Sequence, residues 1–223
     1  MSNEKKNVNV EETAKKQSFL EKNWKMLCAV LVGIGVIIGG YYGYKKLIVE
    51  PKEESANVML ASCQDLFNQG NFEQALKGDG KECKGLLAVV NQYGGTCAGN
   101  LANAYAGVCY YNLQKYDDAI KSLEAFDVCD DTSISPAAIA ALGNCYACKN
   151  QNDKAVEKLL QAANKANSSA LSPGWLVQAG EIYEFGLNNK EKALECYNKV
   201  KNDFPLSMQA SMIDAYIERA SVK

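Results

Sequence analysis

The residues of this sequence whose types and spacing best suit a chemical reaction are two cysteines, Cys145 and Cys148. Their C-x-x-C spacing is that of thiol–disulfide oxidoreductases and of half a zinc site. A reactive pair needs a helix N-terminus, where the dipole lowers the thiol pKa, but this pair falls late in an expected helix. No second C-x-x-C supplies two more zinc ligands. A thiol-redox protein that uses Cys145 and Cys148 is therefore the less favoured alternative.

The acidic residues offer no better catalytic arrangement. The densest group, Asp127, Asp130 and Asp131, is expected in a solvated loop between repeats. The sequence has no histidine, which removes the usual general base at neutral pH and the commonest metal ligand. We therefore predict that the protein is not an enzyme, holds no cofactor or metal, and has no small-molecule substrate.

The charge distribution argues against a nucleic-acid binder. Residues 1–25 carry six lysines and four glutamates, whereas residues 47–223 carry fifteen lysines and one arginine against twenty-two acids. A basic tail ahead of an acidic body lacks the clustered positive surface that phosphates require. Arg219 is the only arginine. We expect proteins as partners and no nucleic acid.

The nine cysteines leave the question of disulfides open. Several of them, including Cys109, Cys145 and Cys196, stand beside tyrosines at positions that suit a small apolar residue. We interpret most cysteines as such packing residues. A periplasmic location would nevertheless favour oxidation of some of them.

A membrane anchor is indicated by residues 26–44, which carry no charge. A helix of this length spans roughly 28 Å, close to the hydrocarbon thickness of a bilayer. Trp24 and Tyr41 stand at opposite rims, as interfacial aromatic residues do. No signal-peptide cleavage site follows, so we expect a retained transmembrane helix and then a linker, 45–55, in which Pro51 ends the helix.

The flanking lysines predict the orientation. Four precede the span and three follow it closely, which favours a cytoplasmic N-terminus and a periplasmic body at a bacterial inner membrane. The reverse topology, with the body in the cytoplasm, is the alternative. Gly35, Gly39 and Gly43 share one helix face, so we hypothesise membrane helix pairing there, although glycine is also simply frequent in such helices.

The body is periodic. Gly107, Gly143 and Gly180 recur at intervals of 36 and 37 residues, and a tyrosine follows each by three positions. An alanine then opens the next helix, and a bulky residue follows four positions later, at Leu123, Leu159 and Tyr197. Two antiparallel helices approach closely where a small residue lies at their crossing, so this pattern predicts helical hairpins packed through glycine.

These residues resemble the tetratricopeptide repeat (TPR) family, and Leu142-Gly143, Tyr146, Ala155, Leu159 and Ala162 match its pattern best. The predicted fold is all-α, with one N-terminal transmembrane helix, a TPR-type helical-hairpin solenoid and a C-terminal capping helix. The predicted division is a basic cytoplasmic tail at 1–25, a transmembrane helix at 26–44, a linker at 45–55, TPR-like repeats at 56–204 (a degenerate first unit, then units near 100–132, 136–169 and 173–204) and a capping helix at 205–223.

The resemblance implies a partner-binding groove lined by the first helix of each unit. The residues expected there are Leu101, Ala104, Val108, Tyr111, Ala140, Asn144, Cys148, Val177, Glu181 and Phe185. The lysines with which some TPR domains hold acidic chaperone tails are missing, and only Asn144 fits that clamp. The groove should suit extended hydrophobic segments, although any one of these side chains is equally suited to packing between repeats.

The whole order of elements is similar to that of YfgM-like membrane-anchored TPR proteins. The basic tail with Phe19-Leu20-Glu21-Lys22-Asn23, the single span and the closing Asn202-Asp203-Phe204-Pro205 carry this resemblance, and Gly99-Asn100-Leu101-Ala102-Asn103 resembles the Bacteroidetes branch. It implies a membrane-anchored interaction scaffold, an accessory subunit of the Sec translocon or of a periplasmic chaperone network. A TPR adaptor for another envelope complex is the alternative. The partner's identity and the oligomeric state stay open.

Overall fold

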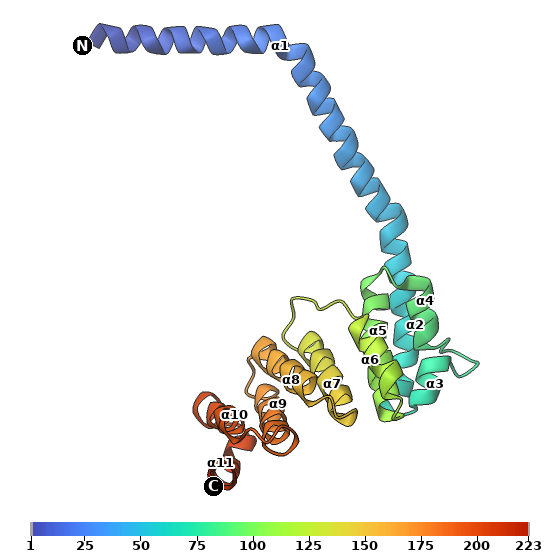
Figure 1. Cartoon of the computed structure of the whole chain (residues 1–223). Helices are drawn as coiled ribbons and strands as arrows, with labels where there is room; N and C mark the ends of the chain where they lie inside the picture. The colour runs from blue at the N-terminus through green and yellow to red at the C-terminus, as the bar shows by residue number, and fades with distance from the viewer. Residues whose placement is uncertain (1, 223) are drawn as a thin grey trace. The chain divides into compact units, whose positions relative to one another are not determined.

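Helices provide all the regular structure in the computed structural model, which describes the backbone of residues 2–222 and the side chains of residues 23–222. The chain divides into two units, residues 1–51 and residues 52–223 (Figure 1). The predicted all-α fold class is confirmed. The lysines and glutamates of the expected tail lie almost wholly in residues 1–22, outside the described side chains.

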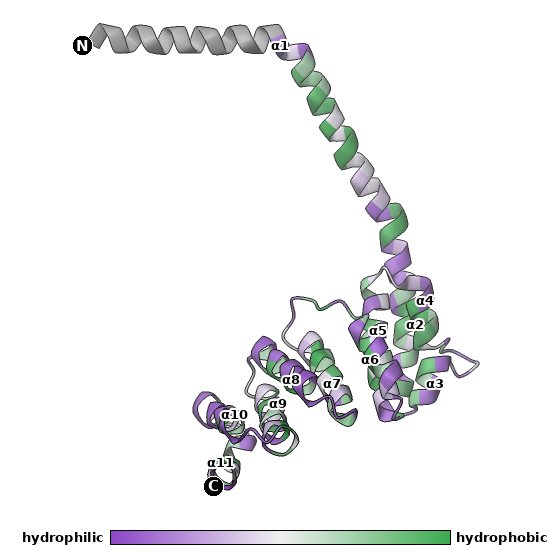
Figure 2. Cartoon of the chain, viewed as in Figure 1, coloured by the Kyte–Doolittle hydropathy of each residue, from purple (hydrophilic) through white to green (hydrophobic). Residues whose placement is uncertain are grey.

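The first unit is dominated by one long helix, α1 (Ser2–Tyr44). Its described side chains are mostly hydrophobic (Figure 2). Among the residues described, the helical stretch that begins at Asn23 is long and apolar enough to cross a membrane, and none of its most apolar 18-residue window is buried. A core helix of a soluble protein would bury that surface.

Pro51 does not end the helix, so that expectation is wrong. The chain continues from α1 through a π-helical turn, Lys45–Val49, into α2 (Glu50–Asn68), with Pro51 in the first turn of α2. Proline is tolerated in a first turn. In the preceding π turn the Glu50 N–H bonds the Lys45 carbonyl five residues back, and this wider turn makes room for the proline ring.

The second unit is a series of antiparallel helices (Figure 1). After α2 come α3 (Phe72–Lys77), α4 (Leu86–Tyr93), α5 (Cys97–Asn112), α6 (Tyr116–Glu124), α7 (Ile134–Cys148), α8 (Asn152–Ala166), α9 (Ser172–Glu181) with its π-helical extension η2 (Ile182–Gly186), α10 (Lys190–Asp203), the 3₁₀ turn η3 (Gln209–Ser211) and α11 (Ile213–Ser221). The pairs α5–α6, α7–α8 and α9–α10 form the three hairpins.

Glycine sets the spacing within each hairpin, as the sequence predicts. A Cβ added to Gly107 would lie 2.4 Å from Leu123, and one added to Gly180 would lie 2.3 Å from the Tyr197 ring. Gly143 is slightly less crowded, with Leu159 at 3.1 Å. The bulky residue of each second helix therefore packs directly onto the bare backbone of the first.

The interrupted first repeat contains an ordered loop. Gly78 and Gly85 both have φ of +97°, and a Cβ on Gly85 would lie 2.6 Å from the Leu76 carbonyl oxygen. A carboxylate oxygen of Asp79 accepts hydrogen bonds from the backbone N–H groups of Lys81 and Cys83. Glycine is thus required at the loop's closure, where only it adopts this conformation without strain.

A disulfide fastens this loop to α2. Cys63 and Cys83 are bonded with their Cα atoms 4.9 Å apart, and both are buried in the first core cluster. The disulfide question that the sequence leaves open is thus answered for these two cysteines. Seven other cysteines are free. Cys109, Cys145 and Cys196 are buried within helices, which agrees with their interpretation as small hydrophobic residues.

The C-terminal helix is shorter than expected. It begins at Ile213 rather than at residue 205, after the 3₁₀ turn. Ile213 is buried, but the apolar side chains of Met208 and Met212, within the predicted capping helix, are 83% and 57% exposed. Pro205 and the 3₁₀ turn shift the register of the segment, because a 3₁₀ turn has three residues per turn and an α-helix has 3.6.

We predict that Gly180→Ala destabilises the second unit by about 1–2 kcal/mol, because overpacking outweighs the gain in helix propensity. The Tyr197 ring has no room to move away, since it is fully buried and its hydroxyl is hydrogen bonded to Glu184. Gly174→Ala in α9 is the matched control: its Cβ would meet only Gln209, at 3.6 Å, so stability should hold or rise. Urea unfolding measures both, and equal losses would contradict the packing argument.

Removing the disulfide with Cys63→Ala and Cys83→Ala should lower the free energy of unfolding by about 3 kcal/mol, the loop-entropy value for its sequence separation of 20. The control is the double variant Cys109→Ala and Cys196→Ala. These two cysteines are buried but free, so their removal costs packing and no crosslink. A reducing agent should destabilise the wild type and leave the Cys63/Cys83 variant unchanged. A wild type insensitive to reduction would count against the crosslink.

Candidate protein-binding groove

A hollow of about 480 Å³ lies beside α5 and α7. Three predicted groove residues, Leu101, Ala104 and Val108, form its α5 wall. Tyr105 also comes from α5, and the other lining residues, mostly apolar, come from α2, from the start of α7 and from the α8–α9 connection: Phe67, Ser133, Ile134, Ala137, Ala138 and Leu171. We name this set of ten residues the apolar groove. It contains no ionisable side chain other than the Tyr105 phenol.

Aromatic packing fixes the wall nearest α2. The rings of Phe67 and Tyr105 meet edge to face with centroids 4.8 Å apart. The Gln64 amide donates a 3.2 Å hydrogen bond to the Tyr105 hydroxyl, so this polar group is satisfied within the wall. Small side chains at Ala104 and Ala137 leave open space between this wall and α7.

The opposite wall depends on Asp131, which caps α7. Its carboxylate accepts hydrogen bonds from the backbone N–H groups of Ser133, Ile134 and Ser135, at 2.6–3.2 Å. Burial raises the Asp131 pKa, but the hydrogen bonds from Ser135, Ser133 and Ile134 outweigh it and lower the pKa to about 2. Asp131 is therefore a helix cap rather than the solvated loop acid we expected.

The α6–α7 connection is held against α5 by Asn100. Its amide donates to the Asp127 carbonyl at 2.8 Å and accepts from the Asp127 N–H at 2.7 Å. A second hollow of about 490 Å³ opens here and shares Leu101 and Ile134 with the apolar groove. The two hollows are thus adjacent along α5. Ile134, 48% exposed, lies on the boundary between them.

The remaining predicted groove residues do not line the apolar groove. Ala140 is 2% exposed and packs against α8 and α9, so its prediction as a surface residue is wrong. Tyr111 is half-buried and lies 6.0 Å from Tyr116, measured between ring centroids. Asn144 is half-buried on α7, and Cys148 is exposed at the end of that helix.

Further along the chain, Val177 packs into the C-terminal core cluster and Glu181 is half-buried. Phe185 is 68% exposed, but its ring lies 4.9 Å from the Arg219 guanidinium. The structure therefore brings together three of the four predicted α5 residues and leaves Tyr111 and the predicted residues of α7, α9 and η2 outside the same hollow.

Sequence reasoning missed Phe67, Ile134 and Leu171. Phe67 belongs to the degenerate first unit, where repeat alignment gives no groove position. Ile134 and Leu171 each follow a polar run, 130–133 and 167–169, and stand just before or at the start of a first helix. A large apolar residue within two positions after such a run was the available signal.

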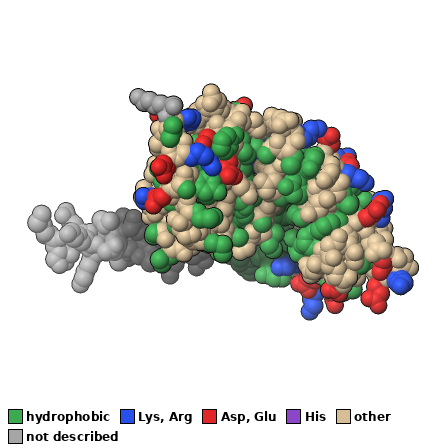
Figure 3. Space-filling model, turned by 90° about the horizontal axis from the view of Figure 1, so that it is seen from below, with side chains coloured by type: hydrophobic (Ala, Val, Ile, Leu, Met, Phe, Trp, Pro, Cys, Tyr) green, Lys and Arg blue, Asp and Glu red, His purple; other side chains and the backbone are tan. Residues whose placement is uncertain are grey.

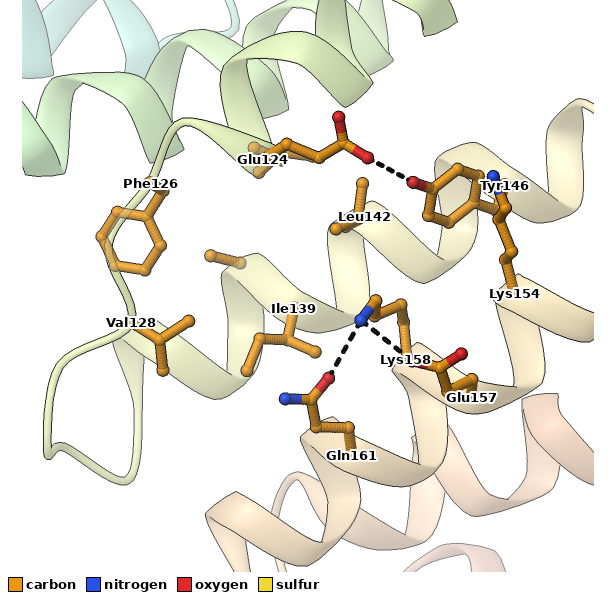
Figure 4. A pocket seen from close by; sticks show the side chains of 12 residues that line it. Glu124, Phe126, Val128, Ile139, Leu142, Tyr146, Lys154, Glu157, Lys158 and Gln161 are labelled. Carbon is orange, nitrogen blue, oxygen red and sulfur yellow. Dashed lines mark hydrogen bonds and ion pairs between the residues drawn. The ribbon is translucent and has the colours of Figure 1, made fainter.

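A third hollow, of about 400 Å³, lies among α6, α7 and α8 (Figure 4). Its polar rim is already paired: the Tyr146 hydroxyl donates to Glu124, and Lys158 contacts Glu157 at 3.1 Å. Lys154 lies 5.0 Å from the centre of the Tyr146 ring. A ligand would have to break these contacts, which makes this hollow a poorer candidate than the apolar groove.

The C-x-x-C pair has unfavourable surroundings for thiol chemistry. Burial raises the pKa of Cys145 to about 12, which disfavours its thiolate at neutral pH. Both cysteines lie in the last turn of α7. No group of three or more metal-ligating side chains was found among residues 23–222.

The surface agrees with an uncharged binding face. Viewed from below, the middle of the second unit is mainly hydrophobic or uncharged polar, and charged side chains lie mostly towards its two ends (Figure 3). Apolar surface of this kind gains free energy when a partner removes it from water.

Comparison with known families supports the repeat assignment. The tetratricopeptide repeat model matches residues 105–126, in α5 and α6, and residues 176–207, in α9 and α10. The α5–α6 and α9–α10 hairpins thus match the tetratricopeptide type. The α7–α8 hairpin, whose residues fit the pattern best by inspection, lies outside the matched stretches. No curated protein matches the chain. Tetratricopeptide repeats generally mediate protein–protein interactions and are typically non-catalytic scaffolds.

An ion pair between a buried carboxylate and a partly exposed guanidinium holds the C-terminal helix. Arg219 of α11 donates from Nε and Nη2 to both carboxylate oxygens of Glu184, at 3.0 and 2.8 Å. The Tyr197 hydroxyl donates to the same carboxylate at 3.0 Å. Hydrogen bonds from Arg219 lower the Glu184 pKa, while burial and the Glu184 charge raise that of Tyr197. Arg219 also lies 4.8 Å from the Tyr216 ring.

We predict that Arg219→Gln destabilises the second unit by about 2–3 kcal/mol, because it leaves the Glu184 carboxylate buried without its cation. The Glu184 side chain is 5% exposed, but that of Arg219 is 44% exposed, which keeps the loss below that of a fully buried pair. Glu218→Gln, an exposed neighbour on α11, is the control and should be neutral.

The pH dependence of this stabilisation follows from the lowered pKa of Glu184. Stabilisation by Glu184 is fully present above its ordinary value of 4.5 and is lost as the pH falls through the lower folded value. The stability difference between wild type and Arg219→Gln should therefore be constant near neutral pH and shrink in acid. Denaturant unfolding at several pH values tests this, and a difference that grows in acid would contradict it.

Proposed function

We propose that this protein is a membrane-anchored scaffold that binds apolar segments of partner proteins in the apolar groove. The observation that carries the proposal is the composition of that groove: about 480 Å³ lined by ten residues, none of them acidic or basic. The walls come from the first helices of successive repeats, α5 and α7, the surface on which tetratricopeptide repeats generally bind partners.

The groove's chemistry favours hydrophobic segments over charged ones. An acidic tail would find no lysine or arginine among the lining residues, and its carboxylate would lose water without gaining a partner. Each buried methylene of an apolar segment gains about 0.8 kcal/mol instead. Backbone atoms of the segment can remain towards solvent, since the hollow is open.

We propose that the apolar helix that begins near Asn23 is a retained membrane anchor with the N-terminus in the cytoplasm. The Cys63–Cys83 disulfide supports a body outside the cytoplasm, because disulfides persist in oxidising compartments. Gly35, Gly39 and Gly43 lie on one face of this helix, and small residues on one face let a second membrane helix approach closely.

Within this scheme the protein acts as an accessory subunit of the Sec translocon or of a periplasmic chaperone network at a bacterial inner membrane. This narrower role rests on the resemblance to YfgM-like proteins and on the apolar groove, which suits unfolded or translocating segments. The raised pKa of Cys145 argues against the thiol-redox alternative. We propose no catalytic function.

The test is site-specific photo-crosslinking in intact membranes, with the probe at Ser133 in the groove and a control probe at Gln161 in the third hollow. Capture of translocon subunits, chaperones or their clients at Ser133 alone is the expected result. Ala137→Asp, which places a charge in the groove but in a favourable first helical turn, should reduce that capture about tenfold or more. Ala215→Asp makes the same change on α11 and should have no effect.

Protease treatment of intact spheroplasts establishes the topology in parallel. An accessible body that captures envelope proteins agrees with the proposal. A protected body that captures cytoplasmic proteins would overturn the orientation and the Sec assignment. Equal capture at both probe positions, unaffected by Ala137→Asp, would overturn the groove itself.

A further inference from the structure

The second hollow contains two exposed free thiols, those of Cys97 and Cys129. They come from different elements: Cys97 is the first residue of α5, and Cys129 lies in the connection between α6 and α7. Neither is needed for packing, because both side chains face the solvent-filled hollow.

Asn100 brings the two thiols near each other. It lies one helical turn after Cys97 on the same face of α5, where side chains three positions apart are neighbours. Its amide nitrogen is also 3.9 Å from the Cys129 sulfur. The two cysteines therefore lie on either side of one side chain.

Both cysteines are held by backbone hydrogen bonds, but only Cys97 lies within a helix. The N–H of Cys97 is bonded to a Glu53 carboxylate oxygen at 2.9 Å, and the N–H of Ala98 to the other oxygen at 2.9 Å, so this end of α5 is fixed. Residues 127–130 of the connection are all exposed and are held to α5 through Asn100. The Cys129 N–H also donates to the Ser135 hydroxyl of α7 at 2.9 Å, a bond that any movement of Cys129 has to break. A local shift of this connection would bring Cys129 to Cys97.

We propose that Cys97 and Cys129 form a redox pair, which a disulfide oxidant converts into a second, reversible disulfide across this hollow. The thiolate of one cysteine attacks a sulfur of the oxidant's disulfide, forming a mixed disulfide and releasing one oxidant thiol. The thiolate of the other cysteine then displaces the second oxidant thiol and forms the Cys97–Cys129 bond. Two electrons and two protons thereby pass to the oxidant, which leaves as a dithiol or as two thiols.

The bond would cross the hollow next to Leu101 and Ile134, which also line the apolar groove. A disulfide requires Cα atoms within about 7 Å, so its formation draws the connection towards α5 and pins the residues before Ile134. The shape of the groove's edge would then follow the redox state of the compartment. The bond itself does not depend on the proposed partner function.

The test uses the full-length protein purified in detergent, with oxidised glutathione as the oxidant. After oxidation, free thiols are blocked with an alkylating agent, and chymotryptic peptides are analysed without reduction. We expect a linked Cys97–Cys129 peptide and a loss of about two of the seven free thiols. Dithiothreitol should reopen this bond before Cys63–Cys83, whose cysteines are only 0% and 2% exposed.

Variants separate this pair from the other exposed cysteines. Cys97→Ser and Cys129→Ser should each abolish the link and leave the partner alkylatable, whereas Cys148→Ser, exposed but outside this hollow, should leave the link intact. Full alkylation of Cys97 and Cys129 after oxidation would overturn the proposal. So would a link from either one to Cys148 or to a second molecule.

Discussion

The packing of a bare glycine backbone against one bulky side chain recurs in all three hairpins, and the second unit is built on it. In each hairpin the first helix approaches the second closely: Leu123 and Tyr197 leave no room for a Cβ on the facing glycine, and Leu159 leaves little. This approach sets the direction of each first helix relative to the next. Because α5 and α7 keep their own hairpin partners so close, the space between them is left to small residues such as Ala104 and Ala137, and the apolar groove is that space.

The same hairpin contact connects to the C-terminal helix. Tyr197 fills the gap at Gly180 and reaches Glu184 with its hydroxyl, and Glu184 in turn binds Arg219. The packing contact between Gly180 and Tyr197 and the buried Glu184 carboxylate are thus linked through side chains in direct contact. Buried polar groups that are fully satisfied in this way specify a single arrangement of the surrounding helices. No buried side-chain nitrogen or oxygen among the described residues lacks a partner.

The parts of the structure that sequence predicted are those governed by local spacing. The glycine and tyrosine periodicity predicts the hairpins because each contact joins residues only 16 or 17 positions apart. One wall of the groove was predictable for a similar reason, since Leu101, Ala104 and Val108 share a helix face. The facing residues Phe67 and Leu171 depend on how successive repeats pack, and the pairings Cys63–Cys83 and Glu184–Arg219 depend on tertiary position alone. Composition could not predict these two pairings, because nine cysteines allow many disulfides and the single arginine could pair with any of many acidic residues.

The attachment of α2 has a mechanical consequence. This helix opens the second unit and is fixed at two points, through Glu53 to the first turn of α5 and through Cys63 to the loop before α4. Tension applied at its N-terminal end would first stretch two charge-assisted hydrogen bonds and then a covalent bond, before it reached the apolar contacts of the core. The helix through which a pull from the N-terminal side enters the second unit is therefore tied to its neighbours at two points, so the groove beside α5 can keep its shape under such a load.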